Sequence, residues 1–551
     1  MTPAQLSDLI VASLADLSAE GAITLSVDVP ATVTVERPRQ KGHGDYATNV
    51  ALQLAKQAGL APRDLAGLLS ERLATADGIA GVEIAGPGFL NISVEAAAQG
   101  VVADDVVGAG AAYGRSATLA GERVNIEFIS ANPTGPLHLG HTRWAAVGDA
   151  LARVLTAAGA HVEREFYIND RGTQMDKFGD SVLARALGTD VPEDGYHGEY
   201  VADLARAVLD AQPGILELPE AERRVAFRET AYRIQLAQQQ EELAEFHTTF
   251  DVWFSERSLH DDESVVDNLE KLRSEGHLYD EGGAVWMRTT DFGDDRDRVL
   301  IRSNGELTYF ASDTAYYLDK RGRGFDRCVY LLGADHHGYV GRLRAMAACA
   351  GDDPDAHVEV LIGQLVTIMQ GGQELKLSKR AGTLLTLREL IDLIGVDPLR
   401  YTLARYPADS PLTLDAAEMT RQASDNPVFS VQYAHARVSS LLRNGRELGL
   451  LPASHPELLT HEAEGQLLRA LAELPRVVAS AAALREPHRV ARYLEDTATS
   501  YHRFYEQCRV LPMGDQEPSD LHRARLRLVE ATRVALANGL GLLGVSAPDR
   551  M

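Results

Sequence analysis

Residues 124–170 contain two strand-like segments joined by one helical segment, and this arrangement restricts the fold more than any other feature of the sequence. The strand-like stretches "VNIEFIS" and "HVEREFYIND" begin at Val124 and His161. Between them, an apolar stripe predicts a helix from about Thr142, and Gly159 stands where a C-terminal cap is expected. Two strands joined by such a helix usually pair in parallel, so we expect an α/β domain with a parallel sheet.

The 551 residues divide into three predicted domains. Residues 1–115 predict an α+β unit, and residues 116–420 predict the α/β domain with an inserted helical segment at about 185–250. Residues 421–551 predict helices throughout, because they hold long Ala-, Leu- and Arg-rich stretches and no convincing strand. Within the first domain we expect a helix at about 3–19, strands at 23–29 and 31–37, a helix at 46–58 and a strand broken by a turn at 82–94.

Charge is distributed unevenly along the chain, whose net charge is −25. Residues 421–551 hold 16 arginines, no lysine and 15 acids, whereas residues 1–420 hold 38 basic and 64 acidic residues. An acidic protein does not bind nucleic acid by diffuse attraction, so such a partner must be held by a few placed contacts. Arginine suits bidentate and stacking contacts, although a GC-rich genome explains the arginine bias equally well.

Several classes of protein are disfavoured. No apolar run reaches membrane-spanning length, and the N-terminus lacks the basic front of a signal peptide. Cys328, Cys349 and Cys508 form no CxxC pair, which argues against zinc or a disulfide framework and is typical of a reducing compartment. The dinucleotide-binding motif GxGxxG after a strand and the P-loop motif GxxxxGK[ST] are both absent from the sequence. We therefore expect a cytoplasmic protein with no membrane partner, no zinc and no prosthetic group.

The segment "ANPTGPLHLGHTRW" places His138 and His141 at a loop-to-helix junction directly after the first strand. A helix N-terminus favours phosphate, and Gly140 lets a ligand approach the backbone. Two imidazoles can donate hydrogen bonds to phosphoryl oxygens as charge develops, and in-line displacement at phosphorus needs no nucleophile from the protein. The alternative is that both histidines only cap or pack the helix.

A second candidate segment, "GQELKLSKRAG", carries Lys376, Ser378 and Lys379 between Gly372 and Gly382. The glycines permit a flexible loop, and an ammonium group can neutralise a departing pyrophosphate. Alone, a charged loop of this kind usually faces solvent. Its occurrence about 235 residues after HLGH makes a shared triphosphate site the better interpretation.

These two motifs resemble the signatures of the class I aminoacyl-tRNA synthetases, since HLGH is similar to HIGH and KLSKR to KMSKS. Within that class, "IEFISANPTGPLHLGH", "NPVFSVQYAHAR", "GHGDYATNVA", "GPGFLNI" and the terminal "APDRM" resemble the arginyl-tRNA synthetase family over essentially the full length. The resemblance implies a Rossmann catalytic domain, an N-terminal accessory domain at the tRNA elbow and a C-terminal helical bundle that binds the anticodon. It also implies that a monomer joins L-arginine to tRNA(Arg), with the ATP–Mg²⁺ complex as substrate and tRNA usually required for the first step.

Two positions depart from the second signature, because Leu377 and Arg380 stand where KMSKS has Met and Ser. Some members of the family with a degenerate second signature carry a lysine just before the first one, where this chain has Gly135. We therefore assign the charge on the pyrophosphate side to Lys379. Further ATP contacts are assigned to Gly140, Lys376 and Ser378.

An arginine substrate needs planar carboxylate partners for its guanidinium group. Tyr309 and Asp313 are four residues apart and share one face if the segment is helical. The resemblance assigns the guanidinium to Asp313, the pocket wall to Tyr309 and a second carboxylate to Glu256. It assigns the substrate's α-amino and carboxylate groups to Glu127, Ser130 and Asn132.

The stretch "LLGADHHGY" ends a predicted strand with Asp335, His336 and His337. Adjacent histidines point in different directions and no third ligand stands at a useful spacing, so we predict no metal site. Ligands bind at the carboxyl edge of parallel strands. The class I resemblance puts the adenosine at this edge, and it therefore implies that Asp335 and His336 line the ATP site.

Five residues are candidates for contacts with tRNA. The resemblance places Phe89 and Asn91 at the tRNA elbow, where an aromatic ring and an amide suit an unpaired base. It places Tyr433, Arg437 and Met551 at the anticodon loop. Packing inside the protein is the alternative role for each.

The resemblance implies two chemical steps. The arginine carboxylate attacks the α-phosphorus of ATP, and the terminal ribose hydroxyl of tRNA then attacks the acyl carbon of arginyl-adenylate and releases AMP. A small-molecule nucleotidylyltransferase and a non-enzymatic tRNA-binding protein remain as alternatives. The first leaves the C-terminal helices without a role, and His138, His141 and Lys379 weigh against the second.

Overall fold

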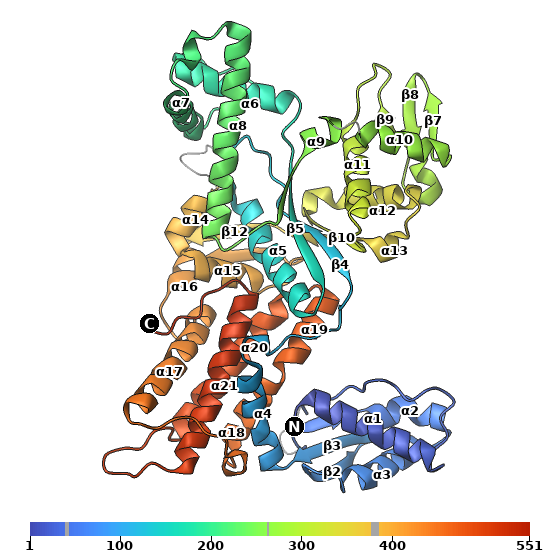
Figure 1. Cartoon of the computed structure of the whole chain (residues 1–551), viewed down its shortest axis with the longest axis vertical. Coiled ribbons are helices and arrows are strands. Elements are labelled where there is room, and N and C mark those ends of the chain that lie inside the picture. The colour runs from blue at the N-terminus through green and yellow to red at the C-terminus, as the bar shows by residue number, and fades with distance from the viewer. Residues whose placement is uncertain (39–42, 262–263, 376–384) are drawn as a thin grey trace.

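The computed structural model describes residues 1–38, 43–261, 264–375 and 385–551 (Figure 1). At its centre is a five-stranded sheet with the order β11-β10-β4-β5-β6, and every neighbouring pair is parallel. The expected parallel α/β domain is confirmed. Its strands are β4 (Arg123–Glu127), β5 (His161–Ile168), β6 (Val252–Ser255), β10 (Arg327–Gly333) and β11 (Val358–Gly363).

The strand order creates a switch point between β4 and β10. The chain passes from β4 to β5 to β6 on one side and returns to β10 on the other side of β4. Connections leave these two neighbouring strands in opposite directions, so a crevice opens at their carboxyl ends, where ligands bind in such sheets. Helix α5 (Leu139–Ala157) starts at this edge, three residues before the expected Thr142, because His138 is its N-cap.

A helical unit is inserted after β5 and appears in green at the top of Figure 1. It consists of α6 (Thr173–Leu187), α7 (Glu199–Ala211) and α8 (Glu220–Glu245), with a separate core that includes Phe178 and Phe227. Helix α6 begins before residue 185, and α8 leads back to β6.

A smaller lobe lies between β6 and β11 (Figure 1). An antiparallel sheet, β7 (Leu278–Glu281), β8 (Ala284–Met287) and β9 (Arg298–Ile301), shares a core with several helices. These helices are α9 (Glu256–Asp261), α10 (Ser264–Ser274), α11 (Tyr309–Gly322) and α12 (Val340–Cys349), and the short α13 (Pro354–His357) leads from α12 to β11. Helix α11 packs against the central sheet, since Tyr316 and Tyr330 lie in this same core.

After β11, a third sheet leads towards the C-terminal region. Its strands are β12 (Val366–Gln370), β13 (Gln373–Glu374) and β14 (Leu412–Asp415). Helices α14 (Leu387–Ile394), α15 (Val396–Ala404) and α16 (Ala416–Thr420) accompany it.

The N-terminal unit has its own core and an antiparallel sheet of order β1-β3-β2. Its elements are α1 (Pro3–Ala19), β1 (Tyr46–Thr48), α2 (Val50–Ala58), α3 (Pro62–Leu73), β2 (Ile79–Ala85) and β3 (Phe89–Val94). The strands expected at 23–29 and 31–37 are wrong, because the only pairing in these stretches is the isolated bridge of Glu36 with Ala47. Ile23 and Val35 are buried, so the apolar pattern there signals burial rather than pairing.

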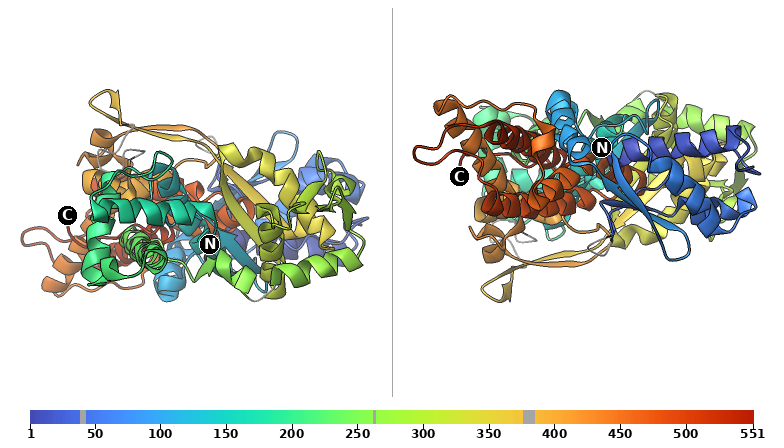
Figure 2. Two further views of the ribbon diagram at one scale, coloured as in Figure 1. Left: turned by 90° about the horizontal axis from the view of Figure 1, so that it is seen from above. Right: turned by 90° about the horizontal axis from the view of Figure 1, so that it is seen from below.

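Residues 421–551 are entirely without strands, as predicted, and form a bundle of long helices. Helix α4 (Ala96–Ala109) packs into the same core, and Tyr113 Oη donates to the Leu471 carbonyl at 2.8 Å. The views of Figure 2 agree that the N-terminal unit lies beside this bundle. The bundle helices are α17 (Pro427–Glu447), α18 (Glu462–Ala472), α19 (Leu474–Leu484), α20 (His488–Gln507) and α21 (Asp520–Leu542).

A buried ion pair joins the bundle to helix α5. Arg400 of α15 is fully buried and donates to Asp149 Oδ2 at 2.5 Å, to the Phe246 carbonyl at 2.6 Å and to the Leu543 carbonyl at 3.1 Å. Gly544 is required here, because a Cβ at this position would lie 2.2 Å from the Arg400 guanidinium. Among the described helices, none combines the length and the apolar character needed to cross a membrane.

Candidate active site

Both histidines of HLGH cap the helix that follows them. His138 Nδ1 accepts a hydrogen bond from the Gly140 N–H at 3.2 Å, and His141 Nδ1 accepts one from the His138 N–H at 3.2 Å. The two rings stack with their centroids 3.8 Å apart. The capping alternative is therefore real, but it uses only the Nδ1 atom of each ring.

The second nitrogen of each ring remains a hydrogen-bond donor. Burial lowers the pKa of His138, and burial together with the neighbouring His138 lowers the pKa of His141 to about 3. Both rings are thus neutral at pH 7, and since Nδ1 accepts a hydrogen bond, the proton of each ring is on Nε2. Two Nε2–H donors at a helix N-terminus are suited to phosphoryl oxygens.

A pocket of about 580 Å³ opens beside these rings. Residues 132–141 form one wall, and the loop 195–198 with Tyr200 of α7 in the helical insertion forms the other. Tyr200 Oη donates to the Thr134 carbonyl at 2.9 Å, so the insertion supports the loop before HLGH. Asn132 also lines this pocket and donates to Gln174 at 2.9 Å. No local sequence pattern singles out Tyr200, which lies in the first turn of α7, 59 residues after His141.

The predicted residues Lys376, Ser378 and Lys379 lie outside the described residues. The chain that follows them is bonded to the HLGH segment. The Leu139 N–H donates to the Leu385 carbonyl at 2.8 Å, and the Leu387 N–H donates to the Leu137 carbonyl at 2.8 Å. Residues 385–387 therefore lie against the histidine motif.

Three carboxylates from three elements gather around Tyr167 at the end of β5. Glu127 ends β4, Glu256 follows β6 and Asp313 lies on α11. Burial, and then the charges of Glu256, Asp313 and Glu127, raise the pKa of Tyr167. Ser130 joins the group, since its Oγ donates to Glu127 at 2.9 Å and accepts the Tyr167 N–H at 3.2 Å. Sequence reasoning named all four of these residues but missed Tyr167, whose one signal is its place near the end of a strand.

Burial and mutual repulsion make the charged form of these carboxylates unfavourable, and a bound cation would stabilise it. Burial raises the pKa of Glu256, and it raises that of Asp313 to about 7 against the effect of a hydrogen bond from the Tyr339 hydroxyl. Glu256 Oε2 is buried and, within the described chain, has no hydrogen-bond partner. Buried acceptors and mutually repelling carboxylates favour a ligand that carries both positive charge and N–H donors.

A buried lysine stands behind the carboxylates. Lys320 Nζ lies 2.6 Å from Glu127 Oε2 and 4.2 and 4.3 Å from the ring centroids of Tyr316 and Tyr330. This ammonium group pairs with Glu127 and leaves Glu256 and Asp313 as the acceptors of the pocket. Tyr309, the predicted pocket wall, is 63% exposed and lies one turn before Asp313 on α11.

Asp335 and His336 are exposed on the short helix η4 (Ala334–Tyr339) after β10. His336 Nε2 lies 3.4 Å from Asp335 Oδ2. Over the ranges that the structure describes, no group of three or more His, Cys, Asp or Glu side chains is arranged to hold a metal ion.

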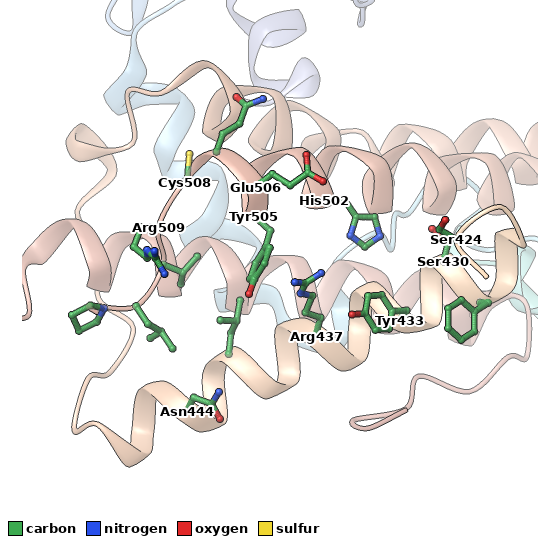
Figure 3. Close-up of a pocket in the computed structure, with 16 residues that line it drawn as sticks. Ser424, Ser430, Tyr433, Arg437, Asn444, His502, Tyr505, Glu506, Cys508 and Arg509 are labelled. Carbon is green, nitrogen blue, oxygen red and sulfur yellow. The ribbon is translucent and has the colours of Figure 1, made fainter. Parts of the chain in front are cut away.

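A groove of about 920 Å³ lies between α17 and α20 of the C-terminal bundle (Figure 3). Tyr433 and Arg437 both line it, and the Arg437 guanidinium lies 3.7 Å from the ring centroid of Tyr505. Tyr433 is 39% exposed and stacks on Phe429. Exposed rings beside a cation suit unpaired bases and their phosphates. Tyr505 and Phe429 were missed, although Tyr505 belongs to the aromatic run "YHRFYEQ" and Phe429 stands four residues before Tyr433 in "NPVFSVQYAHAR".

Met551 is exposed and does not line this groove. The C-terminal segment that carries it lies along α17, because His435 Nδ1 donates to the Pro548 carbonyl at 2.8 Å and Ser439 donates to Asp549 at 2.9 Å.

Phe89 and Asn91 line a pocket of about 610 Å³ in the N-terminal unit. They are two residues apart on β3 and so share one face of the strand. Phe89 is 41% exposed, and Asn91 Nδ2 lies 3.0 Å from His43 Nδ1. The ring is thus exposed to a ligand, whereas the Asn91 amide is buried beside His43.

Three family models match successive parts of the chain. The model "Arginyl tRNA synthetase N terminal domain" matches residues 4–94, "tRNA synthetases class I (R), catalytic domain" matches residues 106–397, and "DALR anticodon binding domain" matches residues 431–551. Proteins named "Arginine--tRNA ligase" from Frankia alni and Kineococcus radiotolerans are 58% and 55% identical to it over 554 residues, with 100% of both chains covered in each case.

The fold also matches a solved structure. The arginyl-tRNA synthetase of Thermus thermophilus superimposes with a TM-score of 0.74 over 99% of both chains, at 23% identity. The likeness extends across the N-terminal unit, the central sheet and the helical bundle.

Proposed function

The chain belongs to the arginyl-tRNA synthetase family, within class I of the aminoacyl-tRNA synthetases, and we propose that the residues singled out above hold its three substrates. It is an arginine–tRNA ligase, which uses ATP to join L-arginine to the 3′ end of tRNA(Arg). The observation that carries the assignment of residues is the convergence of Glu127, Glu256 and Asp313 beside the switch point at which α5 begins.

The carboxylate pocket binds the amino acid. Asp313 accepts the guanidinium N–H groups, and Glu256, with its unpaired Oε2, accepts a further hydrogen bond or charge from the same substrate. Glu127 and Ser130 lie where the loop leaves β4 and face the α-amino group, and Asn132 contacts the α-carboxylate. Tyr309 closes the exposed side of the pocket.

Activation takes place between this pocket and the histidines. The arginine carboxylate oxygen attacks the α-phosphorus of ATP–Mg²⁺, the bond from that phosphorus to the bridging oxygen breaks, and pyrophosphate leaves. The Nε2–H groups of His138 and His141 donate to the phosphoryl oxygens as their charge grows. Gly140 leaves the backbone open to the nucleotide, Asp335 and His336 flank the adenosine side, and Lys376, Ser378 and Lys379 bind the pyrophosphate side.

Transfer follows when the terminal ribose hydroxyl of tRNA attacks the acyl carbon of arginyl-adenylate. The C–O bond to the phosphate breaks and AMP leaves. Phe89 and Asn91 contact the tRNA elbow, and Tyr433 and Arg437 contact the anticodon loop with Met551 nearby. The family resemblance adds that tRNA must be present for the first step.

We further propose a division into residues 1–115, 116–420 and 421–551, with α4 as the connection that docks the first unit on the bundle. The protein acts as a monomer in the cytoplasm, where its tRNA substrate is used, and it needs Mg²⁺ only with ATP and no zinc.

Charging of total tRNA with each amino acid in turn tests the reaction. Arginine alone should be incorporated, and exchange of pyrophosphate into ATP should require both arginine and tRNA. Robust exchange without tRNA would contradict the tRNA requirement, and charging by another amino acid would contradict the assignment of the pocket.

A further inference from the structure

Tyr339 connects the exposed loop after β10 to the guanidinium pocket. It is the last residue of η4, and its hydroxyl donates to Asp313 Oδ2. Residues 335–338 of η4 are exposed, whereas Tyr339 is half-buried. Its ring lies 5.4 Å from the Arg342 guanidinium of α12.

We propose that Tyr339 is a positioning residue for substrate specificity, which orients the Asp313 carboxylate towards the arginine guanidinium and supplies the hydrogen bond that keeps it charged. This inference rests on the proposed role of Asp313 as the guanidinium partner.

The Asp313 carboxylate can accept hydrogen bonds from the Tyr339 hydroxyl and from the substrate guanidinium at the same time. An ionised carboxylate has about four lone-pair sites, and a guanidinium group uses two of them in parallel. The Tyr339 hydroxyl occupies one site on Oδ2 and so fixes the plane of the carboxylate. Oδ1 and the second site of Oδ2 remain for the substrate. Without the hydroxyl, the carboxylate could rotate about χ2.

The electrostatic surroundings make this hydrogen bond important. Burial raises the pKa of Asp313 to about 7, and the nearby carboxylates add to the rise. Tyr339 and Lys320 act in the opposite direction. The titratable or charged groups that face Asp313 and Tyr339 are Glu127 on β4, Tyr167 on β5, Glu256 on α9, Arg298 on β9, Lys320 on α11 and Arg342 on α12.

The raised pKa of Asp313 sets the direction in which arginine binding changes with pH. A carboxyl group with a raised pKa is charged above that pKa, so arginine binds more tightly as the pH rises through about 7. Removal of the Tyr339 hydroxyl raises the pKa of Asp313 further. More of the enzyme is then neutral at pH 7, and a neutral carboxyl group cannot accept a guanidinium bidentately.

Loss of the negative charge on Asp313 also weakens the discrimination between arginine and its neutral analogue. L-citrulline has a neutral urea in place of the guanidinium group, with an oxygen where arginine has a donor. A charged Asp313 repels that oxygen, whereas a protonated Asp313 can donate to it. Tyr339 therefore favours arginine over its neutral analogue.

The test compares Tyr339→Phe with the unaltered enzyme in pyrophosphate exchange with saturating tRNA, from pH 6.5 to 9. We expect the arginine KM at pH 7 to rise about tenfold or more, with the ATP KM changed less than twofold. The ratio of the arginine KM values should fall as the pH rises. Inhibition by citrulline, relative to arginine binding, should strengthen about tenfold.

Tyr317→Phe is the matched control. This residue lies on α11, and its hydroxyl donates to Asp352 at 2.6 Å, away from the pocket. It should leave the arginine KM and its pH profile unchanged. Equal effects of Tyr317→Phe and Tyr339→Phe would overturn the inference, as would an unchanged pH profile in Tyr339→Phe.

Asp313→Asn distinguishes a failure of the proposed arginine site at Asp313 from a failure of the positioning role of Tyr339. If it raises the arginine KM strongly while Tyr339→Phe does not, the positioning role of Tyr339 is wrong and the proposed arginine site stands. If Asp313→Asn leaves the arginine KM unchanged, both the site assignment and the inference fail. Tyr339→His, which retains a donor, should restore part of the arginine affinity if the hydrogen bond is the cause.

Discussion

Substitution of His138 by asparagine separates its capping role from its proposed role in catalysis. Asparagine is among the best N-cap residues, and its Oδ1 can take the place of Nδ1 as acceptor of the Gly140 N–H. It has no atom at the position of Nε2. His138→Asn therefore keeps the start of α5 and removes one donor to the phosphoryl group.

The magnitudes of the two effects differ widely. Loss of one donor to a transition-state oxyanion costs about 10²–10³ in kcat, or about 2.7–4 kcal/mol. Loss of an N-cap costs about 1 kcal/mol of stability. His138→Asn should thus lose about 10²–10³ in kcat with little change in the free energy of unfolding, and His138→Ala should lose the same activity and about 1 kcal/mol as well.

Pyrophosphate exchange with saturating tRNA and urea denaturation measure these quantities. A control is provided by His461, which caps α18 in the same way and accepts the Ala463 N–H through Nδ1 at 3.1 Å. His461→Asn should change neither kcat nor stability appreciably. If His138→Asn retains more than about a tenth of the activity, His138 acts only as a cap and the transition-state argument is refuted. If it is destabilised as much as His138→Ala, the capping argument fails.

Three further substitutions test other parts of the molecule. Asp313→Ala should raise the arginine KM by 100-fold or more, on the order of 3 kcal/mol for a buried charged pair, and leave the ATP KM nearly unchanged; equal effects on both substrates in exchange assays would contradict its role. Arg437→Gln should raise the tRNA KM in aminoacylation about tenfold without changing the arginine KM, because it removes the cation stacked on Tyr505; an unchanged tRNA KM would place RNA binding elsewhere. Arg400→Met should destabilise the fold by about 3–5 kcal/mol in urea denaturation, because it leaves the buried Asp149 without its closest partner; a loss below 1 kcal/mol would show that Arg153 compensates.

The site residues differ in how far local sequence could identify them. The HLGH segment was recognisable because its function depends on a local arrangement, in which a loop, two histidines and a helix start occupy a few consecutive residues. Glu256 and Asp313 could be named only by resemblance. Without it, each is an ordinary charged residue, and 56 residues separate them in the chain.

Tyr167 and Tyr339 show what local pattern could not reveal. Each lies at the end of an element, and neither has neighbours in sequence that suggest an arginine site. Their roles arise because parallel strands place the carboxyl ends of β4, β5, β6 and β10 at one edge of the sheet. The strands expected at 23–29 and 31–37 failed for a related reason, since apolar residues there find burial against α1 to α3 without a pairing partner.

The sequence by itself determined the parallel α/β domain, the helical C-terminal region and a helix start at the HLGH segment, because these depend on periodicity and backbone geometry over short stretches. Only the tertiary structure decided which nitrogen of each histidine caps α5, which carboxylates share a pocket and how Arg400 ties the bundle to α5. Such features depend on contacts between residues that are distant in the chain, and contact, burial and charge in those places are set by the packing of whole elements.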